Sequence, residues 1–240
     1  MGLSFMAGLA WLFIAGAACL LSAGRLKKTA LEILARVLGA SLSPALYAML
    51  TLPGFFLHEG AHALTALVLR VPIQGVSFIP RRAAGDLGVG ASVQVARRDA
   101  LRMALIALAP VLAGTVALGL LSGVFGTAAP DPRPWVRLPT WLAGLDWRSG
   151  QLWVGAYLIW SIGSHMAPSP TDMRYVWAGA LAFFAVLVLA GLLLTLAGTA
   201  LLDALGTVLG RLGDGLAVGA VLNAVFLIPA ALIALLLRRR

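Results

Sequence analysis

The chain has 240 residues, of which 61% are hydrophobic and 11% charged, and its mean hydropathy is +0.97. A soluble domain carries about 25% charged residues, so this composition excludes an ordinary soluble protein and indicates a polytopic membrane protein. Lys and Arg outnumber Asp and Glu by 18 to 9. They cluster at the ends of apolar runs, which favours membrane topology over nucleic-acid binding. The single cysteine, Cys19, excludes an intrachain disulfide and a cysteine-based zinc site.

The N-terminal part of the chain predicts three membrane helices. A helix that crosses a bilayer needs about 20 apolar residues, and residues 2–23 supply the first such run. A basic stop follows at 24–28. The next apolar stretch is roughly twice the length of one span, and Pro53 divides it. We therefore expect two further helices, at about 29–52 and 54–70.

The segment after these helices predicts a β-hairpin. Residues 71–80 and 89–95 both alternate loosely between apolar and polar side chains, and a Gly-rich turn near Gly85 and Asp86 separates them. An open strand edge cannot face lipid. We therefore expect the hairpin to lie at the membrane surface or against protein.

The rest of the chain predicts four more spans and one outward loop rich in proline. The spans are expected at 101–124, 151–167, 173–197 and 216–237. The loop, 125–150, carries Trp135, Trp141 and Trp147, as is typical of a membrane interface.

Together these elements predict an all-α polytopic membrane protein with about six to seven transmembrane helices and a small membrane-associated β-hairpin. The chain is expected to form a single integral membrane domain over 1–240. Its core would cover about 50–180, with accessory helices at 1–49 and 181–240. With seven crossings, the basic regions 24–28, 70–102 and 238–240 face the cytoplasm, while the loops 125–150 and 198–215 face out.

One motif carries the chemistry. His58, Glu59 and His62 form an H-E-x-x-H pattern inside an apolar stretch. On a helix this spacing places two imidazoles on one face, close enough to share a metal ion, with the glutamate as a general base toward water. Burying three such groups costs several kcal/mol by order of magnitude unless they are paired or bound to metal. A satisfied polar cluster between helices is the alternative.

A catalytic zinc needs a third protein ligand and an open position. Asp172 is the leading candidate, because it is the only acidic residue between Asp146 and Asp203 and follows the helix-breaking Pro168 and Pro170. Its alternative role is to cap the helix that begins near Met173.

His165, seven residues before Asp172, is the remaining candidate. Its candidate roles are to bind the metal as the third ligand, to donate a hydrogen bond to a ligand, or to bind the transition-state oxygen. Its alternative is a packing role near the membrane interface.

These residues resemble the site-2 protease class of intramembrane zinc metalloproteases. The resemblance rests on the apolar-embedded His58-to-His62 motif, the hairpin-like segment after it and the proline-rich Ala167-to-Asp172 motif, over about residues 50–180. It implies that His58, His62 and Asp172 bind Zn²⁺ and that Glu59 activates water. The chain departs from the family pattern at Met173, where a glycine is usual, and in lacking an asparagine after Pro110.

The sequence thus predicts a multi-pass zinc metalloendopeptidase of the cell membrane, plasma or inner, that cuts transmembrane or signal-peptide substrates. Its expected partners are the lipid bilayer and the substrate, with a larger membrane complex as a further candidate partner, and no nucleic acid. The alternative is a proteolytically inactive membrane scaffold or accessory subunit that retains the metal site. A metal transporter is a third hypothesis, although the spans lack a second set of polar residues.

Overall fold

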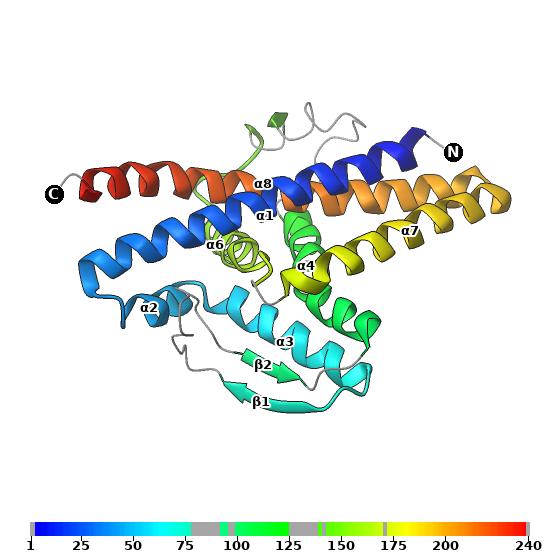
Figure 1. Ribbon diagram of the computed structural model, residues 1–240. Coiled ribbons are helices and arrows are strands. Elements are labelled where there is room, and N and C mark those ends of the chain that lie inside the picture. The colour runs from blue at the N-terminus through cyan, green and yellow to red at the C-terminus, as the bar shows by residue number, and fades with distance from the viewer. Residues whose placement is uncertain are drawn as a thin grey trace.

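Two long helices near the ends of the chain, α1 (Leu3–Leu38) and α8 (Thr199–Arg238), lie side by side and run in the same direction (Figure 1). The computed structural model describes residues 3–77, 92–95, 99–124, 139–140, 143–169 and 172–238. Within these residues, the remaining structure consists of shorter helices and one two-stranded sheet packed beneath the α1–α8 pair.

The basic stop expected at 24–28 is wrong, because α1 passes through it without a break. Lys and Arg are good helix formers, so this basic run does not end the helix. α1 ends instead before Gly39, whose φ of +88° is the left-handed conformation that commonly follows a helix end. The helix expected at 29–52 is therefore split between the end of α1 and the short helix α2 (Ser43–Leu50).

The loop expected at 198–215 is also wrong, because these residues after Gly198 form the first part of α8. Only Gly198, with φ +118°, separates this helix from α7 (Met173–Ala197). Both aspartates of this segment, together with Gly206 and Gly213, lie against α1. Asp203 accepts a hydrogen bond from Ser4, and Asp214 accepts one of 2.9 Å from the indole of Trp11.

Glycines allow α1 and α8 to pack closely. A Cβ added at Gly8 would lie 2.3 Å from the carbonyl oxygen of Gly206, so neither helix could keep its position with a larger residue there. The core lies between this pair, α4 and α6. Its least exposed apolar side chains, at most 2% exposed, include Phe5, Cys19, Leu118, Ile159 and Leu202.

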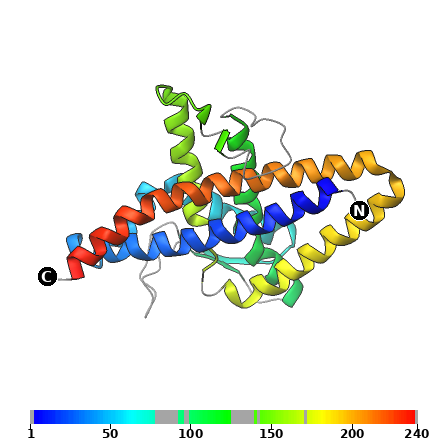
Figure 2. The ribbon, with the colours of Figure 1, turned by 90° about the horizontal axis from the view of Figure 1, so that it is seen from above.

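The helices expected at 101–124 and 173–197 are confirmed as α4 (Ala100–Val124) and α7. The helix expected at 151–167 is α6 (Gly150–His165), which is two residues shorter at its C-terminal end. Figure 2 shows α4 and α6 crossing the α1–α8 pair steeply. Below them lies α3 (Leu52–Val68), which begins with Pro53 in its first turn and contacts both α4 and α6.

The described strands are β1 (Ile73–Ser77) and β2 (Ser92–Val95), which pair antiparallel with an irregularity between Ile73 and Gly75. The turn expected near Gly85 and Asp86 lies outside the described residues, as do Trp135 and Trp141 of the expected interfacial loop. Trp147 is described, and it is exposed and lies against Trp153.

Four of the described helices are long and apolar enough to cross a membrane: α1, α4, α7 and α8. α2, α3 and α6 are shorter, at 8, 17 and 16 residues. The expected class of a mainly helical membrane protein is therefore supported by four candidate spans among the residues described.

Candidate metal centre

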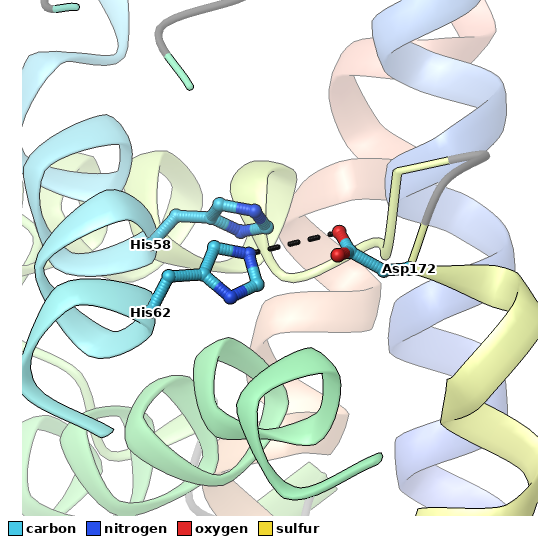
Figure 3. A group of neighbouring side chains, drawn as sticks. All are labelled: His58, His62 and Asp172. Carbon is cyan, nitrogen blue, oxygen red and sulfur yellow. Dashed lines mark ion pairs between the residues drawn. The ribbon is translucent and has the colours of Figure 1, made fainter. Parts of the chain in front are cut away.

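Three side chains that are far apart in the sequence converge between α3 and the start of α7. His58 and His62 lie one turn apart on α3, and Asp172 faces them from the residue before α7 (Figure 3). One potential ligand atom from each residue lies within 4.8 Å of the other two. Nε2 of His62 lies 3.6 Å from Oδ2 of Asp172.

The end of α6 orients the first imidazole. His165 is the last residue of α6, so its carbonyl has no partner within the helix. Nδ1 of His58 lies 2.7 Å from that carbonyl oxygen. Because a carbonyl only accepts hydrogen bonds, Nδ1 carries the proton and Nε2 of His58 keeps a free lone pair.

The second imidazole is oriented in the same way by α4. Nδ1 of His62 lies 2.9 Å from the carbonyl oxygen of Ile106 and donates to it. Nε2 of His62 is then also unprotonated in the neutral ring, and it points toward Asp172 (Figure 3). Histidines that bind metal almost always make such a hydrogen bond through the other ring nitrogen.

The carboxylate of Asp172 is held by Ser169. Oδ2 accepts hydrogen bonds from the Ser169 hydroxyl at 2.6 Å and from the Ser169 backbone N–H at 3.0 Å, while the Asp172 N–H donates back to the hydroxyl at 3.2 Å. Burial disfavours the charged form, but the adjacent His62 and the bonds from Ser169 outweigh it and lower the pKa of Asp172. Asp172 is therefore a carboxylate at neutral pH.

The same helix break supplies partners to two candidate ligands. If α6 continued past His165, its carbonyl would accept the N–H of Ser169, four residues on. The helix ends there, and Pro168 prevents its regular continuation. The freed carbonyl bonds to His58, and the freed N–H bonds to Asp172.

Glu59 lies on α3 beside the two histidines and is only 8% exposed. His58 lines a small pocket together with Pro110, Gly114 and Met166. The candidate general base and His62 are thus buried, and His58 and Asp172 are half-buried.

The ring of His165 does not belong to the converging group. Its Nε2 lies 2.6 Å from the hydroxyl of Thr51, and that hydroxyl lies 2.7 Å from the carbonyl oxygen of Tyr47. Because the Thr51 proton is donated to the carbonyl, the hydroxyl accepts from Nε2–H of His165. Among the described residues, His165 therefore reaches the centre through its backbone carbonyl, which bonds to His58.

The structure brings together His58, His62 and Asp172, the three ligands predicted from the sequence. It also resolves the alternative role of Asp172. Its side chain makes no N-cap hydrogen bond, and instead occupies the fourth position of a Ser-x-x-Asp capping box that begins at Ser169. Sequence analysis missed Ser169, although the capping-box pattern was the signal for it.

Comparison with known proteins gives no family for this chain: no family model, curated protein or solved structure matches it.

The centre has the donor set of a divalent cation site. Two unprotonated imidazole nitrogens and a carboxylate oxygen repel one another unless a cation lies between them, either a proton on His62 or a metal ion. Two nitrogens and one oxygen are a common ligand set of catalytic zinc, which leaves a fourth position open. The residues present therefore fit a zinc ion.

Proposed function

We propose that this chain is a zinc metalloendopeptidase that hydrolyses peptide bonds of membrane-embedded substrates. The observation that carries the proposal is the convergence of His58, His62 and Asp172, with both Nδ1 atoms committed to backbone carbonyls. A site with this arrangement has both Nε2 atoms ready to bind metal before any metal arrives.

The side chains indicate which residues bind the metal and which one transfers protons. A zinc ion held by the two imidazoles and the carboxylate would polarise the scissile carbonyl and lower the pKa of attacking water to about 7. Glu59 takes the proton of that water and returns it to the leaving amine. Its neighbour His58 is held by the end of α6, so base and ligand keep their relative position on α3.

The setting supports a membrane-embedded substrate. The outward side chains of α3 at Leu64, Leu67 and Val68 are apolar and more than 60% exposed, as suits lipid contact. We place α3 in the membrane with the longer apolar helices, in a multi-pass protein of the plasma or inner membrane. The β1–β2 pair would lie at the membrane surface.

The substrate class follows from the same setting. A peptide bond within a helix is shielded and already hydrogen-bonded, so a transmembrane or signal-peptide segment must be extended before cleavage. The β1–β2 pair, which contacts α3, offers strand edges to which an extended segment can pair. This agrees with the resemblance to the site-2 protease class in the motif around His58.

The first test is the metal content of the purified protein in detergent. We expect about one zinc ion per wild-type chain, and its loss in both His58→Ala and Asp172→Ala. Asp99→Ala is the matched control, because Asp99 is exposed and bonded only to the first turn of α4 among the described contacts. Zinc-free wild-type protein, or an Asp172→Ala variant that keeps its zinc, would contradict the proposed site.

The second test separates catalysis from metal binding. Glu59→Gln should retain zinc, because Glu59 is not one of the converging residues. Its cleavage of detergent-solubilised transmembrane peptides should fall by about 10²–10⁴-fold, the usual contribution of a general base. Undiminished cleavage by this variant would refute the mechanism. If the wild type binds zinc and cleaves none of the peptides, the alternative of an inactive scaffold gains support.

A further inference from the structure

The carbonyl that holds His62 is unusual within its own helix. In an α-helix the carbonyl of each residue accepts the N–H of the residue four positions later. Four positions after Ile106 stands Pro110, which has no N–H, and α4 continues past it to Val124. The Ile106 carbonyl therefore lacks its regular helical partner.

His62 supplies the missing partner. Its Nδ1 donates to the Ile106 carbonyl at 2.9 Å, and both residues are buried, at 8% and 5% exposed. A buried carbonyl without a partner is unfavourable by about 1–3 kcal/mol. The proline therefore creates an acceptor beside α3 that an imidazole satisfies.

We propose that Pro110 is a positioning residue of the metal centre. By removing one backbone donor it reserves the Ile106 carbonyl for Nδ1 of His62, and this places the proton of the neutral ring on Nδ1 and turns Nε2 toward Asp172. The inference rests on the proposed function in that it assigns His62 as a metal ligand. It adds a residue that touches neither metal nor substrate.

If Pro110 served only to pack or shape α4, its substitution would lower the stability of the protein. Alanine is favoured over proline within a helix by about 3 kcal/mol, so Pro110→Ala should leave α4 at least as stable. It also restores an N–H that competes with His62 for the Ile106 carbonyl. A variant that is no less stable but binds metal more weakly therefore distinguishes positioning from packing.

The experiment measures zinc affinity by competition with a chelator, in Pro110→Ala and Pro110→Val, the second of which better preserves side-chain volume. Pro229→Ala is the matched control, because Pro229 also lies inside a helix, α8, that carries none of the converging residues. We expect the zinc dissociation constant to rise by about 10-fold in both Pro110 variants, the usual effect of losing a partner of a metal ligand, and to stay unchanged in Pro229→Ala. Melting temperatures verify that each variant is folded. If Pro110→Ala does not fold, the zinc affinity of Pro110→Val decides the test.

A second readout does not depend on zinc. The chain has three histidines, so ¹⁵N spectra of histidine-labelled, zinc-free protein resolve each ring. With the His62 ring neutral, the wild type should show its proton on Nδ1, whereas the Pro110 variants should show a mixture of both tautomers at His62 alone. An unchanged tautomer together with unchanged zinc affinity would overturn the inference. A wild type that binds no zinc would refute the proposed function, while the tautomer would still test the role of Pro110.

Discussion

Ser169 gives Asp172 a defined position before any metal binds. The serine contributes both its hydroxyl and its backbone N–H to the same carboxylate oxygen, which leaves the other oxygen, Oδ1, without a bond to Ser169. Partners of this kind orient a ligand and tune its affinity for metal. Ser169 therefore belongs to the site although it does not reach the converging nitrogens itself.

Replacing Ser169 by alanine should weaken zinc binding without abolishing it. The variant loses the hydroxyl bond of 2.6 Å and keeps the backbone bond of 3.0 Å. We expect the zinc dissociation constant to rise by about 10-fold, measured by chelator competition. Ser122→Ala is the control, because the Ser122 hydroxyl also makes a local bond, but on α4 and to Gly119. Equal affinity in the two variants would show that the backbone bond alone positions the carboxylate.

At the residue scale, the sequence predicted side chains better than backbone partners. The His58-to-His62 motif and Asp172 could be predicted because their chemistry resides in side-chain identity. The carbonyls of Ile106 and His165 could not, since every residue carries a carbonyl. These carbonyls can accept a hydrogen bond from a histidine because a helix ends there or lacks a backbone donor. In the sequence, only the nearby prolines indicate this.

At the scale of elements, the meeting of α3 and α6 decides where His58 lies. Gly54 donates its backbone N–H to the Ser161 hydroxyl at 2.9 Å, and a Cβ at Gly54 would lie 2.0 Å from the Ser161 carbonyl oxygen. Only a glycine permits this approach. His58 follows one turn later on the same helix and reaches the end of α6.

Two glycines of α3 should therefore respond in opposite ways to alanine. Gly54→Ala should push α3 away from α6, which lowers both the melting temperature and the zinc content. Gly60→Ala should keep its zinc and be stabilised by up to about 1 kcal/mol, because Gly60 has open space around it and alanine is the better helix former. Both are measured by thermal unfolding and metal analysis. Normal zinc content in Gly54→Ala would show that the close approach is not needed for the site.

The elements that the sequence predicted well have clear ends. α4 begins directly after Asp99, α7 lies between Asp172 and Gly198, and both helices match their expected ranges within one residue. α1 and α8 do not match, because hydropathy reports how far an apolar run extends and not where a helix stops. The polar first part of α8 is helical because residues of α1 such as Ser4 and Trp11 satisfy its carboxylates.

At the scale of the whole molecule, α1 and α8 pair along nearly their full lengths, but their apolar stretches are offset. Ser22, just before the basic run of α1, lies beside Asn223, which is well inside the apolar part of α8. A helix of 40 residues is about 60 Å long, about twice the thickness of the hydrocarbon core. No property of either segment alone predicts this offset, because it is a feature of how the pair packs.

The pairing of α1 with α8 also has a consequence for how the protein is made. Ser4 and its partner Asp203 are 199 residues apart, and at about 5–20 residues per second the ribosome needs roughly 10–40 s to synthesise that length. During this time the glycine-bearing face of α1 has no α8 to pack against. α3, α4, α6 and Asp172 are all synthesised before α8 begins at Thr199. The order of synthesis thus lets the metal centre assemble first and the first helix find its partner last.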